Sequence, residues 1–154
     1  EKSLQKDREI VEICQKIKKC KKENKEIKID ISQIPDLCPI IAVLLTFLDK
    51  TSYIINGKRL RLKESDRLES TSNMLNDLGA NCQIIGDELK ISGKISGGQV
   101  DSFNDHRIVM AASIASLLAK DEIIIKNYKA VDKSYPSFFK TFEKLGGKIE
   151  YLGV

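Results

Sequence analysis

Acidic and basic side chains gather at four places along the chain, each just ahead of a segment that is predicted to be helical. The clusters are Asp36, Lys63-Glu64 with Arg67, Asp105-His106-Arg107, and Lys133. A helix N-terminus carries about half a positive charge, so a cation there is unfavourable unless an anion binds nearby. Arginine binds a planar carboxylate through two parallel hydrogen bonds, whereas lysine binds phosphate through a compact, localised charge. The clusters therefore predict a site for a small ligand with several anionic groups.

Each of these residues also has an ordinary structural interpretation. An Asp or Ser ahead of a helix is usually a cap, and a His beside an Arg is commonly a surface pair. The alternating segment from Arg59 to Lys63 is predicted to be a strand with three cations on one face and two leucines on the other. Such a strand is more often a solvated edge than a ligand platform. The recurrence of the clusters is what favours a site.

The elements that must carry these residues repeat along the chain. Asp36 and Asp105 each precede an apolar run and then a β-branched strand, at 52–56 and 122–127. Lys63 and Lys133 recur at almost the same interval as the two acids. We therefore predict about two and a half copies of one unit of roughly 68 residues. Residues 1–30 would end an incomplete copy, and residues 31–98 and 99–154 would form the next two.

Each unit is predicted to be an α/β unit with one inner and one outer helix. Residues 37–48 and 108–118 are apolar on every side, so these helices must be buried. The outer helix of the first unit has an apolar face, with Ser65 as its predicted cap, and ends at Gly79. The outer helix of the second unit is expected to follow Lys133, with Ser134 as its cap and Pro136 in its first turn. Residues 82–85 and 89–91 are predicted to form a hairpin.

Composition is that of one globular domain, since the chain has 154 residues of which 42% are hydrophobic and 31% charged. The net charge of +4 suits a small anion and does not favour nucleic acid. The longest apolar stretch, residues 37–48, is too short to span a bilayer, so no membrane association is expected. Because the sequence opens without Met and partway through a unit, we interpret it as a fragment.

The four cysteines, Cys14, Cys20, Cys38 and Cys82, lack the spacing of metal ligands, and the single His lies far from them. We expect reduced thiols in a cytoplasmic protein. No metal and no cofactor are expected.

Four motifs resemble those of the 3-phosphoshikimate 1-carboxyvinyltransferase (EPSP synthase) family, the target of glyphosate. The motifs are Ile34-Pro35-Asp36, residues 62–68, residues 104–110, and Lys133 to Pro136. They follow the order of the family. The resemblance implies a two-domain cytoplasmic enzyme, expected to be a monomer. Each domain of the family is built from βαβαββ units, and this chain would be part of its C-terminal inside-out α/β barrel domain.

The resemblance also implies a reaction in the shikimate (chorismate) pathway of aromatic amino-acid biosynthesis. The enolpyruvyl group of phosphoenolpyruvate is transferred to the 5-hydroxyl of shikimate 3-phosphate through a tetrahedral intermediate, and phosphate leaves. The implied roles are Asp36 as base for the hydroxyl, Glu64 for proton exchange at C3, His106 near the reacting carbon, Arg67 and Arg107 on the phosphoenolpyruvate carboxylate, Lys133 near its phosphate, and Lys63 on shikimate 3-phosphate.

Two departures qualify the resemblance. Arg59 stands where some members of the family carry Asn, so no contact is assigned there. The other domain of the family supplies further phosphate-binding and phosphoenolpyruvate-binding residues, so this chain alone is expected to be inactive. Two alternatives stay open, namely the related transferase that acts on a UDP-amino sugar and a binding module related to RNA 3′-phosphate cyclases. The absence of a Cys-containing loop and of clustered aromatic residues speaks against them.

Overall fold

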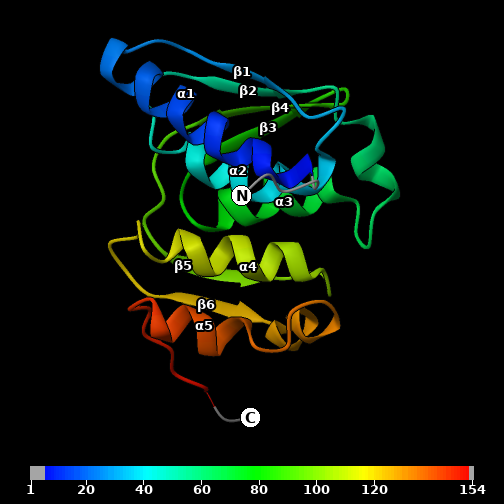
Figure 1. Cartoon of the computed structure of the whole chain (residues 1–154), viewed down its shortest axis with the longest axis vertical. Coiled ribbons are helices and arrows are strands. Elements are labelled where there is room, and N and C mark those ends of the chain that lie inside the picture. Colours follow the sequence, from blue (N-terminus) through cyan, green and yellow to red (C-terminus); the bar gives the residue numbers. More distant parts are fainter. Residues whose placement is uncertain (1–5, 153–154) are drawn as a thin grey trace.

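A four-stranded mixed sheet forms one side of the molecule (Figure 1). The computed structural model describes residues 6–152. The strands are β1 (Lys28–Asp30), β2 (Ser52–Ile55), β3 (Asn81–Ile85) and β4 (Glu88–Ser92), in the spatial order β1-β2-β4-β3. Strands β1 and β2 are parallel, and β4 runs antiparallel to both of its neighbours. A tight turn at Gly86, whose φ is 61°, joins β3 to β4 as the predicted hairpin.

A second, smaller sheet holds two parallel strands, β5 (Gly98–Asp101) and β6 (Ile123–Lys126). Helices α1 (Ile10–Glu23), α2 (Cys38–Leu45) and α3 (Arg67–Asp77) belong to the part of the chain around the first sheet (Figure 1). Helices α4 (His106–Ala115) and α5 (Phe138–Lys144) accompany the second. Four short 3-10 helices complete the described elements: η1 (Lys6–Glu9), η2 (Pro35–Leu37), η3 (Lys58–Leu62) and η4 (Tyr128–Lys133).

The two predicted inner helices are confirmed as α2 and α4, which pack against each other. Ile41 and Ile108 are fully buried, as the all-round apolar sequence of both helices requires. Helix α3 packs on β3, α2 and α4, with Leu68 and Leu75 buried in the main core. A smaller cluster around Phe138 joins α5 to α4. The α/β fold class predicted from the sequence is therefore confirmed. No helix among the described residues has the length and apolar character needed to cross a bilayer.

The segment from Arg59 to Lys63 is not a strand, so this prediction was wrong. It forms the 3-10 helix η3, in which Leu60 is buried while Leu62 is 87% exposed. The reason lies in long-range contacts, because Arg61 donates hydrogen bonds to Asp87 and to the backbone oxygen of Gly86 in the β3–β4 turn. These contacts hold the segment against the hairpin.

Two predicted helix starts are also wrong. The side chain that caps α3 is Asp66 rather than Ser65, and it accepts hydrogen bonds from the backbone of Leu68 and Glu69. Lys133 ends η4 instead of opening the outer helix.

Helix α5 begins only at Phe138, so Ser134 is not its cap and Pro136 lies outside its first turn. Proline disfavours a helical conformation in the residue before it, which explains the later start.

The same backbone hydrogen bonds occur just after each of the two parallel strand pairs. Their donors and acceptors are shifted by one constant number of residues from the first pair to the second. Ile31 N donates to Ile55 O, and Ser102 N donates to Lys126 O. The next turn repeats this relation, with Ile34 N bonded to Ile31 O and Asp105 N bonded to Ser102 O. Ile34 and Asp105 are therefore equivalent positions of the repeat.

Asp36 follows β1 by six residues, whereas Asp105 follows β5 by four. The position equivalent to Asp36 is therefore occupied by Arg107 and not by Asp105. The prediction that Asp36 and Asp105 are equivalent positions of the repeat was therefore wrong. The unit boundaries at residues 30 and 98 stay a prediction.

Candidate active site

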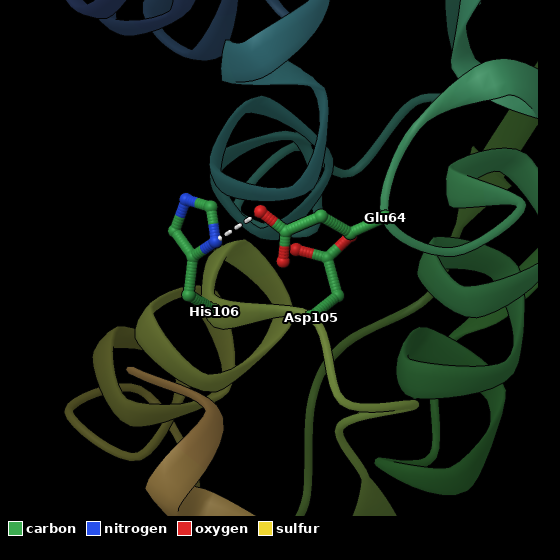
Figure 2. A group of neighbouring side chains, drawn as sticks. All are labelled: Glu64, Asp105 and His106. Atoms are coloured by element: carbon green, nitrogen blue, oxygen red, sulfur yellow. Dashed lines mark ion pairs between the residues drawn. The ribbon is translucent and has the colours of Figure 1, made fainter. Parts of the chain in front are cut away.

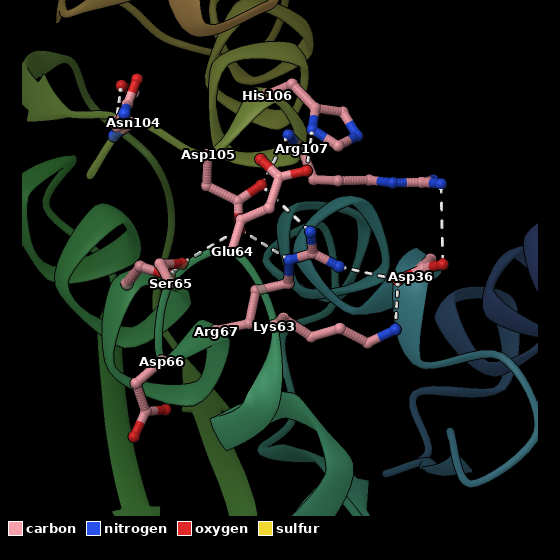
Figure 3. A network of polar contacts seen from close by, with 12 residues as sticks. Asp36, Lys63, Glu64, Ser65, Asp66, Arg67, Asn104, Asp105, His106 and Arg107 are labelled. Carbon is pink, nitrogen blue, oxygen red and sulfur yellow. Dashed lines mark hydrogen bonds and ion pairs between the residues drawn. The ribbon is translucent and has the colours of Figure 1, made fainter. Parts of the chain in front are cut away.

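Arg67, the first residue of α3, joins the two inner helices through a buried ion-pair network (Figure 3). Its side chain is only 3% exposed. Nε donates to Asp105 Oδ2 at 2.7 Å and Nη2 donates to Asp105 Oδ1 at 3.2 Å. Nη1 donates to Asp36 Oδ1 at 2.7 Å. Burial lowers the pKa of Arg67, but Asp105 and Asp36 together outweigh it and hold the pKa above its ordinary value. The guanidinium is a fixed charge between two carboxylates.

Asp36 lies in η2, directly ahead of α2, among three cations (Figure 3). Its Oδ1 is 3.0 Å from Lys63 Nζ and 2.7 Å from Arg67 Nη1, and its Oδ2 is 3.8 Å from Arg107 Nη2. Burial raises the pKa of Asp36, but the hydrogen bond from Lys63 and the charges of Arg107, Lys63 and Arg67 hold the pKa below its ordinary value. In this arrangement Asp36 is an anion that organises cations.

Asp105 is the N-cap of α4 and is fully buried. It accepts hydrogen bonds from the backbone of Arg107 at 2.9 Å and from Ser65 Oγ at 3.0 Å, in addition to those from Arg67. Burial raises the pKa of Asp105, but the bond and charge of Arg67 hold the pKa below its ordinary value, with help from Arg107 N and Ser65. Asp105 therefore fixes where α3 and α4 begin relative to each other.

Glu64 and His106 form a second pair beside this network, with His106 Nδ1 2.8 Å from Glu64 Oε1. The contact is not a hydrogen bond, because Nδ1 has no partner in line with it. The His106 side chain is 11% exposed and that of Glu64 is 38% exposed. A partly exposed carboxylate with a ring nitrogen beside it is suited to exchanging a proton with a bound ligand.

Arg107 and Lys133 are less tightly held. Arg107 is 3.7 Å from Asp7 in η1 and 3.8 Å from Asp36, so its contacts are long. Lys133 is exposed, and its Nζ donates to the backbone oxygen of Asn104 at 2.8 Å. Both side chains can reorient towards a bound anion at a small cost in free energy, because the contacts they give up are weak.

Two hollows adjoin these residues. A groove of about 250 Å³ is mostly apolar and has Asp36 and Arg107 as its charged lining residues. A second hollow of about 290 Å³ is lined by Lys133, Lys129 and Asn104, among others. The structure thus brings six of the seven predicted site residues into one network or directly beside it, and Lys133 reaches this region through the backbone next to Asp105.

Comparisons with known proteins identify the family of this chain. The family described as EPSP synthase (3-phosphoshikimate 1-carboxyvinyltransferase) has a model that matches residues 5–142. This chain belongs to the EPSP synthase family. A 3-phosphoshikimate 1-carboxyvinyltransferase of Clostridium novyi is 45% identical over 96% of this chain and 37% of that protein. The same-named protein of Methanococcus maripaludis is 38% identical over 97% of this chain and 38% of that protein.

Solved structures support the family fold. The EPSP synthase of Acinetobacter baumannii matches 78% of this chain and 29% of that chain, with a TM-score of 0.73 and 28% identity. The enolpyruvyl transferase NikO of Streptomyces tendae matches 84% of this chain and 30% of that chain, with a TM-score of 0.65 at 16% identity, which supports the fold alone. The chain spans little more than a third of the length of its EPSP synthase relatives.

In this chain, Glu64, Asp105 and His106 also offer ligand atoms that lie within 4.8 Å of one another (Figure 2). Both oxygens of Asp105 are already engaged by Arg67. A guanidinium that lies 2.7 Å from one of these oxygens and 3.2 Å from the other opposes a metal ion in the same place. The trio is therefore better described as part of the ion-pair network than as a metal centre.

Sequence reasoning placed Asp105 in a charged cluster without a partner, assigned Ser65 only as a helix cap, and gave Asp7 no role. The signal for Asp105 was present, because an acid directly ahead of an apolar helix is a natural cap. Its partnership with Arg67, 38 residues away, leaves no trace in spacing or periodicity. Asp7 lies in η1 and reaches Arg107 only through the tertiary fold.

Proposed function

We propose that this chain forms part of the active site of an enzyme that transfers the enolpyruvyl group of phosphoenolpyruvate to the 5-hydroxyl of shikimate 3-phosphate. Membership of the EPSP synthase family supports this proposal. The observation that carries it is the gathering of Lys63, Arg67 and Arg107 around Asp36, with Glu64 beside them. Both substrates are multiply charged anions, and three cations gathered around one carboxylate match them.

Asp36 is proposed to accept the proton of the 5-hydroxyl. With Lys63 and Arg67 bonded to it, its lowered pKa makes it a weak base. If the phosphate of shikimate 3-phosphate draws Lys63 away, Asp36 loses its first hydrogen-bond donor, and its pKa rises towards the ordinary value. Substrate binding would then activate the base at the moment it is needed.

Arg107 and Arg67 are proposed to bind the carboxylate of phosphoenolpyruvate. Arg107 has only long contacts, at 3.7 Å and 3.8 Å, so its guanidinium can form two parallel hydrogen bonds to the carboxylate of phosphoenolpyruvate. Arg67 is held at 2.7 Å by Asp36 and by Asp105, so it contributes charge at a fixed position.

Glu64 is proposed to exchange the proton at C3 of phosphoenolpyruvate, with His106 next to it near the reacting carbon. The two side chains lie 2.8 Å apart. Lys133 is proposed to bind the phosphate that leaves.

The remaining contacts and the closure of the site are proposed to come from a second, N-terminal domain, with the parent protein acting as a monomer. On this view the chain alone binds weakly and turns over undetectably. We also propose a cytoplasmic location, which is supported by the four unpaired cysteines.

The experiment uses the complete gene product and follows phosphate release from phosphoenolpyruvate in the presence of shikimate 3-phosphate. Formation of 5-enolpyruvylshikimate 3-phosphate, identified by mass spectrometry, is the expected result. A UDP-amino sugar in place of shikimate 3-phosphate is the control, and release with that acceptor alone would contradict the proposal. A parallel assay with EDTA tests the expectation that no metal is needed, since activity should then be unchanged.

A further inference from the structure

We propose that two Asp–Asn hydrogen bonds at strand ends position the loops that carry the candidate active-site residues. They join Asp30 to Asn56 and Asp101 to Asn127, and we refer to them as the strand-end clasps. The inference deepens the proposed function, because it names positioning residues for the same site.

The first strand-end clasp closes the ends of β1 and β2. Asp30 is the last residue of β1, and its Oδ1 accepts from Ser32 N at 2.8 Å. Its Oδ2 accepts from Asn56 Nδ2 at 2.8 Å. Asn56 directly follows β2 and has a left-handed backbone with φ at 64°. Asparagine is one of the few residues that adopt this conformation readily, so it is suited to the turn as well as to the bond.

The second strand-end clasp repeats the first at the ends of β5 and β6. Asp101 Oδ1 accepts from Phe103 N at 2.7 Å and from Asn127 Nδ2 at 3.1 Å. Asn127 directly follows β6 and is again left-handed, with φ at 56°. In both clasps the two partners are 26 residues apart. The same acid, the same amide and the same backbone conformation at equivalent places indicate one device used twice.

The two segments that leave the first strand-end clasp meet again at the site. One leads from Asp30 through η2 to Asp36, and the other leads from Asn56 through η3 to Lys63. Lys63 Nζ is 3.0 Å from Asp36 Oδ1, so the segments form a closed ring of chain with the clasp at one end. A shift at the clasp is therefore transmitted to both site residues.

The second strand-end clasp has the same consequence. One segment leads from Asp101 to Asn104, directly ahead of the cap Asp105, and the other leads from Asn127 through η4 to Lys133. Lys133 Nζ donates to Asn104 O at 2.8 Å and closes this ring as well. In each case a lysine contacts the segment that enters an inner helix; Lys63 directly follows η3, and Lys133 is the last residue of η4.

Stability alone does not account for the clasps. Asp30, Asn56 and Asn127 are exposed, and exposed polar contacts add little to the free energy of folding. The strands they close are already paired through their backbones and anchored by buried residues such as Ile29 and Val100. Catalysis is more sensitive, because small displacements of reacting groups reduce turnover strongly.

The test compares variants of the complete gene product. Asp30→Ala and Asp101→Ala should each lower kcat/KM about tenfold, since the reacting groups lose their alignment, while the melting temperature stays nearly unchanged. The reversed pair Asp30→Asn with Asn56→Asp restores one donor and one acceptor and should recover most of the loss. Asp49→Ala, which removes an exposed ion pair with Lys94, is the matched control and should leave kcat/KM unchanged.

A second measurement does not depend on the proposed function. Hydrogen–deuterium exchange should show faster uptake in residues 31–37 and 57–63 of the Asp30→Ala variant and recovery in the reversed pair. Unchanged uptake, or a reversed pair as impaired as the single variant, would overturn the clasp. If the unaltered protein transfers no enolpyruvyl group, the proposed function fails, and the exchange result still decides for or against the clasp.

Discussion

Arg107 occupies the position in the β5–α4 segment that Asp36 occupies in the β1–α2 segment, and the two side chains face each other with Arg107 Nη2 3.8 Å from Asp36 Oδ2. The same position of the repeat therefore holds an anion, Asp36, in one copy and a cation, Arg107, in the next. The candidate site lies where these two unlike copies meet.

The long contacts of Arg107 lead to a prediction for the Arg107→Ala variant of the complete gene product. Loss of a charge-assisted pair of hydrogen bonds should raise KM for phosphoenolpyruvate about tenfold or more. The value of kcat should change much less, and KM for shikimate 3-phosphate should barely change. Steady-state kinetics with each substrate varied in turn measures all three. An unaltered KM for phosphoenolpyruvate would remove Arg107 from the carboxylate site.

Glu64→Gln should act on chemistry rather than on binding. The amide keeps the size of the side chain but cannot exchange a proton, so kcat should fall about 100-fold or more with little change in either KM. Incorporation of deuterium from heavy water into C3 of phosphoenolpyruvate should fall with it. Glu69→Gln, in the first turn of α3, is the control. Weaker binding without a loss of turnover would refute the proton-transfer role.

The buried pair of Arg67 and Asp105 predicts a large effect on stability. Asp105→Asn keeps the cap on α4 but removes the charge opposite a guanidinium that is 3% exposed. The free energy of unfolding should fall by about 3 kcal/mol, because a buried guanidinium loses the closer-bound of its two carboxylate partners and keeps only Asp36. Urea denaturation of the chain measures this, with Asp49→Asn as a control at an exposed pair. Equal effects at the two sites would show that the Arg67–Asp105 pair contributes no more than a surface contact.

The same pair, together with Asp36, predicts how stability depends on pH. Both carboxylates have a pKa below the ordinary value in the folded state. Their contribution is therefore fully present above the unfolded pKa of about 3.9 and is lost as the pH falls through the folded pKa. Urea denaturation at several pH values should show stability falling steeply below about pH 4. The fall should be shallower in Asp105→Asn, and an equal slope would contradict the assignment.

The four thiols should differ in reactivity. Burial raises the pKa of Cys38 to about 12 and that of Cys82 to about 11. Cys14 and Cys20 lie partly exposed on α1. Since the thiolate is the reactive form, Ellman's reagent should modify Cys14 and Cys20 quickly in the folded chain and all four thiols in urea. Rapid modification of all four without urea would contradict the burial of Cys38 and Cys82.

Much of the fold was accessible from local pattern. The continuous apolar runs after Asp36 and Asp105 predicted the inner helices, and the helix end at Gly79 agrees with its φ of 91°. The gathering of Asp36, Lys63 and Arg107 was predicted from charged residues ahead of helices that recur in the repeat. The helices and the helix end depend on residues close together in the sequence, whereas the gathering of the charged residues follows from the repetition of the unit.

Other features depend on contacts that no local pattern encodes. The alternation of Arg59, Leu60 and Arg61 favoured a strand, but the contacts of Arg61 with Asp87 and Gly86 hold the segment as a 3-10 helix. The two acids recur at almost the interval of the repeat, and this near-coincidence concealed the true equivalence of Asp36 and Arg107. That equivalence became visible only from the backbone hydrogen bonds.

The position of Asn56 has a consequence for how the protein ages. Gly57 follows it, and an Asn-Gly pair is prone to deamidation because the glycine nitrogen can attack the side-chain amide. In the folded chain, Gly57 N donates to Asp87 O and Asn56 Nδ2 donates to Asp30, so both reacting groups are engaged. Loss of the first strand-end clasp would free the side-chain amide of Asn56. The resulting aspartate at position 56 would face the carboxylate of Asp30, and the chain could not close the clasp again.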